Sequence, residues 1–362
     1  MAWLFLIVFL VIYNAIIFYI AHMTRKWIFP NKKSLFKIIY FILFFLLSNI
    51  LVFGFLFDSS IIRAIGFYWM AIFYILFLTV PILHIVVFTT RFTKFKTVQV
   101  EKWAGWLTLL MIVVIMAYGS YNAYNPVVQT FEVKINQENE QKDTLNIVMA
   151  ADMHFGLLSG KNHAARMVEE INKLQPDLVL FPGDIVDDSI HEYVRQGMVD
   201  IISNIESTYG VYASLGNHDK GDIPELIEIL EISNMNVLYD ETIEIADSVT
   251  LVGRKDKTEK DRLSLSELLK NVDQSKPVIL LDHQPYELEI ADKQGVDLLV
   301  SGHTHRGQLA PFQFITRSIY ENDWGYIQKG ELHSVVTSGF GFWGPPIRTN
   351  SQSEIVQIQL HY

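Results

Sequence analysis

Two hydrophobic patterns divide this chain of 362 residues. Up to about residue 121, long apolar runs dominate, and polar residues are confined to short stretches between them. From Leu145 onward, short apolar runs rich in β-prone residues alternate with stretches of helical periodicity. The first pattern is typical of membrane-spanning helices, and the second is typical of an α/β domain.

Four apolar runs in the first third are each long enough to cross a hydrocarbon core of about 30 Å as a helix. The first run has no charged residue, no basic start and no obvious small-residue cleavage site. Because further runs follow it, we interpret it as a membrane anchor rather than a cleaved signal peptide. We therefore expect an all-α membrane module over residues 1–123, with transmembrane helices at residues 1–23, 38–57, 64–90 and 103–121.

The basic residues between these runs predict an orientation. Five Lys or Arg lie between the first and second runs and four between the third and fourth, whereas only Arg63 separates the second from the third. Loops rich in Lys and Arg stay on the cytoplasmic side. With four spans, the N-terminus and everything after residue 121 face outward. The sequence thus predicts an integral, multi-pass membrane protein with an extracytoplasmic C-terminal domain.

The rest of the chain is interpreted as a polar linker over residues 124–144 and one α/β domain over residues 145–362. The expected strands are residues 146–150, 178–181, 211–215, 250–252, 278–281, 298–300, 334–337 and 354–360. The expected helices are residues 163–174, 190–205, 224–233, 264–270 and 286–293.

Charge and composition narrow the function of this domain. Residues 1–130 hold ten Lys or Arg and two Asp or Glu, so the remaining 19 basic and 37 acidic residues make the C-terminal part strongly acidic. An acidic surface disfavours nonspecific nucleic-acid binding, and no nucleic-acid partner is expected. The chain has no cysteine, which excludes disulfides and thiolate metal ligands.

Five short motifs rich in Asp and His lie directly after predicted strands, where α/β folds place ligand sites. They supply carboxylate, amide and imidazole ligands, which suit divalent first-row metals and phosphate chemistry. Each motif alone is a weak signal, but their joint occurrence predicts one dinuclear metal site. The motifs are Asp152-Met153-His154, Gly183-Asp184, Gly216-Asn217-His218-Asp219, Asp282-His283 and Gly302-His303-Thr304-His305.

In type and order these motifs resemble the calcineurin-like metallophosphoesterase superfamily, whose pattern is D-x-H, G-D, G-N-H-[DE], H and G-H-x-H. The resemblance covers roughly residues 146–362 and implies a four-layer αββα sandwich of two mixed sheets. It also implies two divalent metal ions, and Mn, Fe and Zn all fit such ligands. The implied ligands are Asp152, His154, Asp184 and His305 for one metal and Asp184, Asn217, His283 and His303 for the other, with Asp184 as the bridge.

His218 and Asp219 belong to the same motifs, and Asp187 and Asp188 lie shortly after one of them. By the resemblance, His218 stabilises the transition state or protonates the leaving oxygen. Asp219 is expected to orient His218 through a hydrogen bond to its ring, and the alternative is a helix cap or a solvated turn. Asp187 and Asp188 are interpreted as the start of the helix before Ser189 rather than as ligands.

The residues after the last ligand are candidates for substrate recognition. Arg306 is expected either to bind a second phosphate or lipid headgroup, or to be an ordinary surface residue. Residues 338–348 resemble the Gly-rich, W-G-P-P-containing segment of membrane-linked bacterial members of the superfamily. Phe342, Trp343 and Arg348 in it are candidate substrate residues, and the alternative is that its aromatic rings pack as core. Residues 311–326 are open to the same two interpretations, ordinary core packing or an amphipathic flap.

Together these features predict a membrane-anchored, metal-dependent phosphoesterase that acts through a metal-activated hydroxide. A phosphodiester or pyrophosphate bond in a lipid or envelope-linked substrate is favoured, because tethering raises the effective concentration of the site at the bilayer. The alternatives are a phosphomonoesterase or nucleotide hydrolase, and a non-catalytic, metal-stabilised membrane receptor. The expected partners are the phosphoester substrate and the bilayer.

Overall fold

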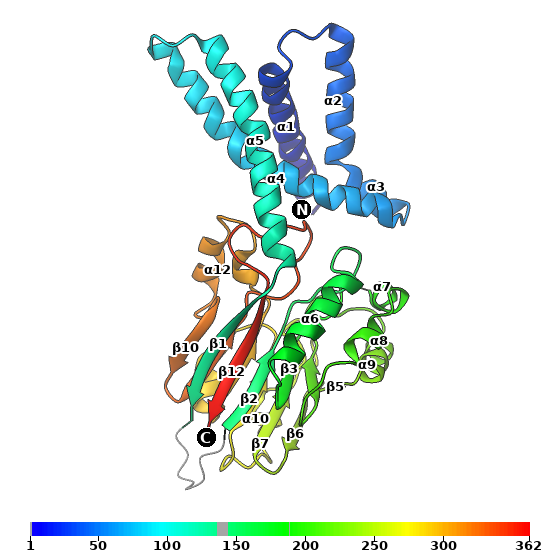
Figure 1. Ribbon diagram of the computed structural model, residues 1–362, viewed down its shortest axis with the longest axis vertical. Coiled ribbons are helices and arrows are strands. Elements are labelled where there is room, and N and C mark those ends of the chain that lie inside the picture. Colours follow the sequence, from blue (N-terminus) through cyan, green and yellow to red (C-terminus); the bar gives the residue numbers. More distant parts are fainter. Residues whose placement is uncertain (1, 136–143, 188) are drawn as a thin grey trace. The chain divides into compact units, whose positions relative to one another are not determined.

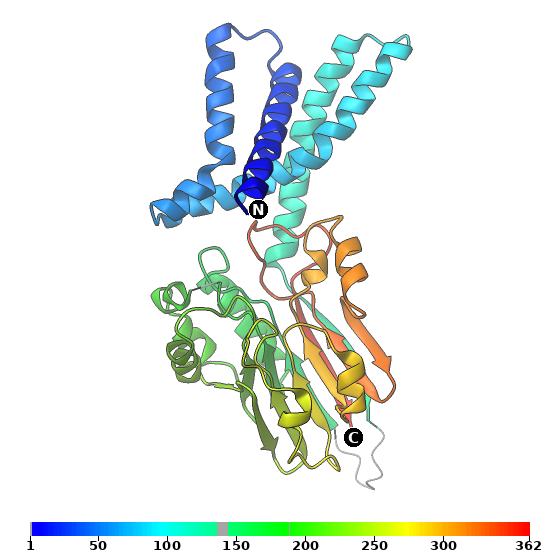
Figure 2. The ribbon, with the colours of Figure 1, turned by 180° about the vertical axis from the view of Figure 1, so that it is seen from behind.

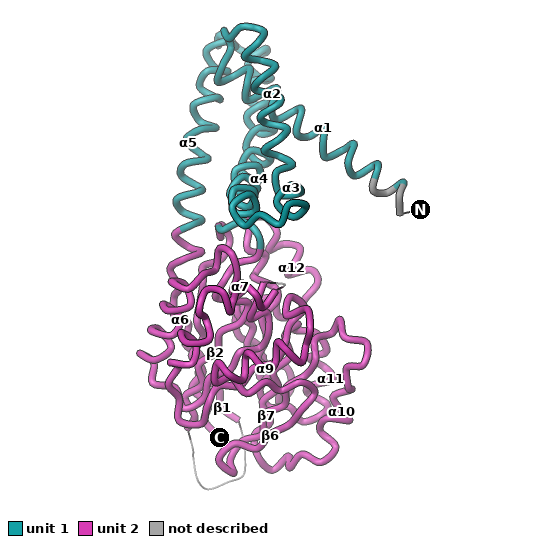
Figure 3. The backbone as a smooth tube through the Cα atoms, turned by 90° about the vertical axis from the view of Figure 1, so that its right-hand side faces the viewer, with its two compact units in different colours: residues 1–120, 344–346 teal, residues 121–343, 347–362 magenta. Residues whose placement is uncertain are grey.

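The computed structural model describes residues 2–135, 144–187 and 189–362. It contains two compact units, which are coloured separately in Figure 3. The helical unit comprises Met1–Ser120 with Gly344–Pro346, and the α/β unit comprises Tyr121–Trp343 with Ile347–Tyr362.

The helical unit contains long apolar helices, as the sequence predicts. Within the described residues, three helices are long and apolar enough to cross a membrane, or four if the bent pair α2 and α3 forms one span. The helices are α1 (Ala2–Ile28), α2 (Ser34–Ser48), α3 (Ile50–Leu56), α4 (Ser60–Thr89), which continues into the 3-10 turn η1 (Thr90–Phe92), and α5 (Thr97–Tyr124).

The expected second span, residues 38–57, is not one straight helix. Helices α2 and α3 meet at Asn49 with a bend of 52°. Asn49 leaves helical geometry with φ of −112° and ψ of 7°, and its amide Nδ2 donates to the carbonyl oxygen of Phe45 at 2.8 Å. An Asn side chain that bonds the preceding turn competes with continuation of the helix. The 15 residues of α2 cover only about 22 Å, less than the hydrocarbon core.

The α/β unit contains two six-stranded mixed sheets, which confirms the predicted fold class (Figure 1). The first sheet has the order β1 (Val127–Lys134), β12 (Glu354–His361), β2 (Thr144–Met149), β3 (Leu178–Pro182), β4 (Val211–Ser214) and β5 (Met235–Val237). The second has the order β10 (Gly325–Lys329), β11 (Leu332–Val336), β9 (Leu298–Ser301), β8 (Val278–Leu281), β7 (Val249–Gly253) and β6 (Glu241–Ile245).

Helices cover the two sheets on their outer faces (Figures 1 and 2). The clusters of buried residues assign α6 to α9 to the first sheet, and α10 and α11 to the second. The helices are α6 (Lys161–Lys173), α7 (Ile190–Arg195), α8 (Met198–Ile202), α9 (Ile223–Ile232), α10 (Leu265–Leu268), α11 (Leu288–Lys293) and α12 (Gln313–Ile319), with the 3-10 turn η2 (His305–Gly307).

Alternation along the strands explains this layering, because successive strand residues face opposite sides of a sheet. In β2, Ile147 belongs to the core between the two sheets and Val148 to the core beneath α6 to α9. In β7, Leu251 likewise faces the core between the sheets, and Val252 faces the core beneath α10 and α11. Strands buried on both faces have continuous apolar sequences, which is why they could be predicted from the sequence.

All eight expected strands are present, with slightly different ends, but β1, β5, β6 and β10 were not predicted. Strand β1 lies inside the segment interpreted as a linker and pairs in parallel with β12, from Val127 opposite Glu354. Along β1 only Val133 is buried, so this edge strand lacks a strong apolar pattern. The expected helix 190–205 is divided into α7 and α8 because Gly197 between them has a φ of +70°.

Candidate metal centre

The predicted metal ligands lie at the carboxyl ends of neighbouring parallel strands. Strands β2, β3 and β4 are parallel neighbours in the first sheet, and β8 and β9 are parallel neighbours in the second. Parallel strands end at the same edge, so the loops that follow them converge. The ligands follow these strands in order, with Asp152 and His154 after β2, Asp184 after β3, Asn217 after β4, His283 after β8, and His303 and His305 after β9.

One group of possible metal ligands consists of Asp152, His154 and His305, all buried. One ligand atom from each of the three side chains lies within 4.8 Å of the others. His154 Nε2 is 3.1 Å from His305 Nε2, which in turn is 3.6 Å from Asp152 Oδ1. Burial lowers the pKa of His154 to about 3 and that of His305 well below its usual value. Both rings are therefore neutral, which is the form of imidazole that binds a metal.

The second group consists of Asp184, His283 and His303, again within 4.8 Å of one another. Asn217 belongs to the same motif set, and its Oδ1 is buried without a hydrogen-bond partner among the described residues. A buried amide oxygen without a partner is costly unless a ligand satisfies it. His283 Nδ1 lies 2.9 Å from the carbonyl oxygen of Pro182, which places the proton on Nδ1 and leaves Nε2 as the ligand atom.

Asp184 joins the two groups. Its Oδ2 lies 3.1 Å from Nε2 of His283 and 3.7 Å from Nε2 of His154, so one oxygen faces a histidine of each group. Burial alone raises the pKa of Asp184, but the neighbouring histidines, His283 first among them, outweigh burial, so the net shift is downward. Asp184 is therefore ionised, as a bridging ligand must be. The donors of both groups fit two divalent cations.

Glycines permit this close packing of ligands. A Cβ on Gly216 would collide with Asp184, and one on Gly302 would collide with Asp152. The backbone N–H of His303 donates to both oxygens of Asp152, at 2.9 and 3.0 Å, and fixes that carboxylate. The glycines of the G-N-H-D and G-H-T-H motifs thus bring backbone and carboxylates together.

The comparisons with known proteins agree with this geometry. Residues 145–307 match the family described as calcineurin-like phosphoesterase. A metallophosphoesterase of Aquifex aeolicus, itself uncharacterised, is 32% identical over 238 residues, which cover 62% of this chain and 89% of that protein. The chain belongs to the calcineurin-like metallophosphoesterase family.

Other metallophosphoesterases match a smaller share of their own length. An uncharacterised metallophosphoesterase of Helicobacter pylori is 34% identical over 223 residues, 60% of each chain. A Danio rerio protein named transmembrane protein with metallophosphoesterase domain is 29% identical over 252 residues, 65% of this chain and 57% of that one. The chain thus spans about 60% of the length of the H. pylori relative.

A third cluster of the metallophosphoesterase was not anticipated from its sequence. Ligand atoms of His154, Asp187 and His218 lie within 4.8 Å of one another, with Asp187 Oδ1 3.9 Å from His154 Nδ1. The helix start expected at Asp187 and Asp188 is instead Ser189, whose Oγ accepts from His191 N at 3.3 Å. Asp188 lies outside the described residues. The available signal was the spacing, since Asp187 follows the bridging Asp184 by three positions.

Asp219 does not have the role expected from the sequence. Its Oδ1 accepts from the backbone N–H of Val186 at 2.9 Å, and its Oδ2 accepts from that of Gly216 at 2.8 Å. Both oxygens therefore connect the loops after β3 and β4, and Asp187 is the carboxylate that faces His218. Asp219 is only 4% exposed, and burial raises its pKa to about 7. It is neither a helix cap nor a solvated turn, because Asp222 caps α9.

Arg348, predicted to face the substrate, has no solvent exposure. Its Nη2 lies 3.2 Å from Nδ1 of His305, and its other nitrogens donate to backbone carbonyls of the same loop, including those of Gly341 and Ser338. The prediction for Arg348 is therefore wrong. A guanidinium that satisfies several carbonyls at once is suited to shaping a loop from within, and here it holds the loop around His305.

The two aromatic candidate substrate residues, Phe342 and Trp343, differ in exposure. Phe342 is 3% exposed, and its ring packs 5.1 Å from that of Tyr124, so it belongs to the core and is not a substrate residue. Trp343 is 55% exposed, and its ring lies 5.9 Å from that of His218. The side chain of Gln308 bonds both the backbone N–H and the carbonyl of Trp343, each at 3.0 Å. These hydrogen bonds hold the backbone of Trp343, so its ring stays beside His218.

Arg306 stacks on an aromatic ring. Its guanidinium carbon lies 3.8 Å from the ring centre of Trp324, a cation–π contact. Near the second ligand group, the ring of His303 lies 5.9 Å from that of Tyr320, whose hydroxyl accepts from the Tyr286 hydroxyl at 3.2 Å. Burial raises the pKa of Tyr320, so it remains protonated. The sequence carries no motif for this tyrosine pair.

Asp282, the first residue of the Asp282-His283 motif, has a structural role. Asp282 is 2% exposed and pairs with Arg254 at 3.1 Å and with Arg262. Two guanidiniums compensate the buried carboxylate. The pair anchors the start of the loop that presents His283.

Proposed function

We propose that this metallophosphoesterase is a membrane-anchored enzyme that hydrolyses phosphodiester or pyrophosphate bonds in a lipid or envelope-linked substrate. The observation that supports it most is the position of Asp184 Oδ2, which faces histidine nitrogens of both ligand groups. Two cations about 3.5–4 Å apart require such a shared ligand.

The ligands assigned to the two ions are those named from the sequence. Asp152, His154, Asp184 and His305 would hold one ion, and Asp184, Asn217, His283 and His303 the other. Divalent Mn, Fe or Zn bound there supplies a hydroxide nucleophile at neutral pH and neutralises charge on the phosphoryl group.

We assign to His218 the role of protonating the leaving group. Its backbone N–H donates to Asp184 Oδ1 at 2.7 Å, which fixes the residue beside the bridging ligand. Its ring lies 5.0 Å from that of His154, and a carboxylate oxygen of Asp187 is within 4.8 Å of its ligand nitrogen. A carboxylate near an imidazole favours the charged, proton-bearing form. Asp187 thus keeps a proton available on His218 for the leaving oxygen.

Exposed apolar residues support a lipid or envelope-linked substrate. Trp343 offers an exposed ring beside His218, and helix α12 has no buried residue. On α12, Phe314 is 67% exposed, and Ile315 and Ile319 are each 53% exposed. This helix is the centre of residues 311–326, one interpretation of which is an amphipathic flap. Large exposed apolar side chains are typical of lipid or membrane contact.

The helical unit supports four crossings and an extracytoplasmic domain. The α1–α2 and α4–α5 connections, which carry most of the basic residues, lie at the same end of this unit (Figure 1). Because positive loops stay in the cytoplasm, the bent pair α2 and α3 must then return the chain across the bilayer before α4. Four crossings place residues after α5 outside.

A nucleotide hydrolase is the second candidate, because an exposed indole beside His218 can also stack on a base. A non-catalytic receptor has less support, since every Asp and His ligand of the dinuclear pattern lies in one of the two groups.

Hydrolysis of bis(p-nitrophenyl) phosphate, p-nitrophenyl phosphate and a nucleotide by the detergent-purified full chain tests the proposal. We expect turnover of the diester that depends on Mn, Fe or Zn, with two metal ions per chain by elemental analysis. Asp184→Asn should abolish both, whereas Asp247→Asn, an exposed acid outside the ligand groups, should change neither. Faster monoester or nucleotide turnover would favour the second candidate. Failure of the metal-loaded wild type on all three substrates would contradict an enzyme.

A further inference from the structure

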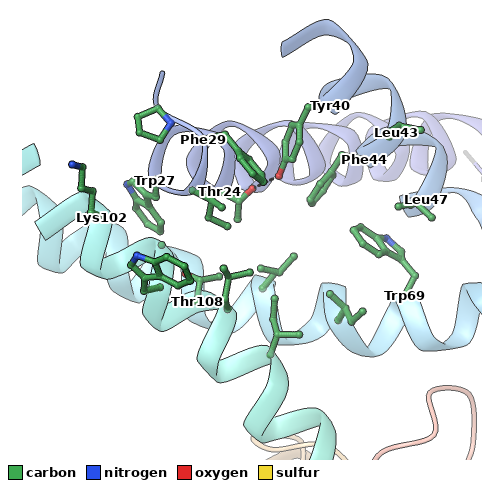
Figure 4. A pocket seen from close by; sticks show the side chains of 18 residues that line it. Thr24, Trp27, Phe29, Tyr40, Leu43, Phe44, Leu47, Trp69, Lys102 and Thr108 are labelled. Carbon is green, nitrogen blue, oxygen red and sulfur yellow. Dashed lines mark hydrogen bonds between the residues drawn. The ribbon is translucent and has the colours of Figure 1, made fainter. Parts of the chain in front are cut away.

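The helical unit contains an apolar cavity of about 750 Å³ lined by residues of α1, α2, α4 and α5 (Figure 4). Its wall consists largely of aromatic and aliphatic side chains, among them Trp27, Phe44, Trp69 and Leu76. The volume lies within the range of small-molecule sites, about 300–1,000 Å³. The lining belongs entirely to the helical unit and includes no metal ligand.

Four polar side chains in the wall are already bonded to the protein. The hydroxyls of Thr24 and Tyr40 lie 2.8 Å apart, as the dashed line in Figure 4 marks. Thr108 donates to the carbonyl of Ala104 on its own helix at 2.8 Å, and the indole N–H of Trp69 donates to a serine hydroxyl at 3.3 Å. With these groups satisfied, the cavity suits a hydrocarbon rather than a polar solute.

The cavity has the length of one leaflet. On α5 it is lined from Lys102 to Ile112, ten residues along the helix. At the rise of an α-helix this distance is about 15 Å, which is half of a hydrocarbon core of about 30 Å. An acyl chain of a phospholipid in that leaflet has this reach.

The end of the cavity at Lys102 is cationic. A second cavity of about 700 Å³ shares Lys102 and Trp106 with the first and adds Lys96 and Trp103. The neighbouring Glu101 pairs with Lys26 at 2.6 Å, and within the described residues no carboxylate lies within ion-pair distance of Lys102. Lysines and tryptophans together are typical of the headgroup level of a bilayer, and basic pockets between helices bind anionic headgroups.

We propose that this pair of cavities binds one molecule of an anionic phospholipid, with an acyl chain between the helices and its phosphate at Lys96 and Lys102. The inference depends on the helical unit being in a bilayer, which is part of the proposed function, but not on phosphoester hydrolysis. A bound lipid fills the space between α1, α2, α4 and α5 and so stabilises the helical unit.

The test uses the full chain reconstituted in vesicles of equal palmitoyl-oleoyl phosphatidylglycerol and phosphatidylcholine. The protein is extracted into mild detergent, and retained lipids are counted by native mass spectrometry. The wild type should retain one phosphatidylglycerol in preference to phosphatidylcholine. Ile112→Trp, which fills the cavity, should lower retention about tenfold, whereas Val113→Trp, on the same helix but 66% exposed and outside the lining, should retain lipid normally.

The contribution of the positive charge at the Lys102 end of the cavity is tested separately. Lys102→Glu should remove the preference for phosphatidylglycerol, while Lys94→Glu, an exposed lysine that lines neither cavity, should keep it. Should Ile112→Trp unfold at a lower temperature than the wild type, Ile72→Trp fills the same cavity from α4.

The proposal fails if the wild type retains no lipid, if the cavity-filling and control variants retain equally, or if phosphatidylglycerol and phosphatidylcholine are retained alike. Flotation of the vesicles with the protein establishes membrane insertion independently. Diester hydrolysis measured on the same samples keeps failure of the enzymatic proposal distinct from failure of the lipid site.

Discussion

Arg348 Nη2 lies 3.2 Å from Nδ1 of the metal-ligand candidate His305, in a position without solvent exposure. The same guanidinium bonds the carbonyls of Ser338, Gly339 and Gly341. One charged side chain therefore defines both the orientation of a ligand and the shape of the loop that precedes Trp343.

Arg348→Lys should destabilise the protein although it keeps the charge. A lysine ammonium has three donors on one nitrogen and cannot span acceptors arranged around a planar fork. Leaving buried carbonyls unsatisfied costs roughly 1–3 kcal/mol each. We expect a clear drop in the thermal midpoint of the detergent-purified chain, and a lower metal content at His305. Arg317→Lys, where the side chain is 54% exposed, is the matched control and should unfold like the wild type.

Asp187→Asn should slow catalysis without releasing metal. We assign Asp187 to His218, so its loss should lower kcat by about 10–100-fold, as loss of a carboxylate behind a functional histidine does. The reduction should be larger for esters with poor leaving groups, because these need the proton most. A series of aryl diesters of increasing leaving-group pKa measures it. Asp222→Asn keeps the cap of α9 and should leave kcat unchanged. An equal loss across the series would contradict the assignment.

The candidate ligands could be placed together from sequence because each follows an apolar strand. Parallel order in β2, β3, β4 and in β8, β9 then makes the strand ends meet, so local sequence implies a long-range arrangement. Strands such as β3, with every residue buried, carry the strongest signal. Edge strands such as β1 and β6 have only one buried residue each, so they lack the apolar run that marks a central strand.

The roles of residues outside the ligand set could not be predicted in the same way. Arg348 and Trp343 lie five positions apart in one loop, yet one is buried and the other is 55% exposed. Asp187 and Asp219 are both acids beside ligands, and only the fold shows which one faces His218. Such distinctions depend on the path of loops, which is set by tertiary hydrogen bonds rather than by periodicity.

Asp219→Ala should destabilise the protein. Both carboxylate oxygens accept backbone N–H groups, from Val186 and Gly216, and alanine would leave these buried donors unsatisfied. We expect a loss of about 2 kcal/mol or more in the free energy of unfolding. Thermal unfolding of the metal-loaded chain measures it. If the variant unfolds like the wild type but slows most on esters with poor leaving groups, Asp219 has the orienting role expected from the sequence.

Phe342 and Trp343 are adjacent, yet substitution by alanine should lower stability at Phe342 and raise KM at Trp343. Phe342→Ala removes a buried ring that packs on Tyr124, so the protein should lose about 3–5 kcal/mol of stability. Trp343→Ala removes an exposed ring, so the thermal midpoint should stay unchanged while KM rises several-fold for a lipid-like or aromatic diester. Comparing KM for an aryl diester and for dimethyl phosphate isolates the ring, because the methyl ester has nothing to stack. If Trp343→Ala raises KM equally for both substrates, the indole shapes the loop and does not contact the substrate.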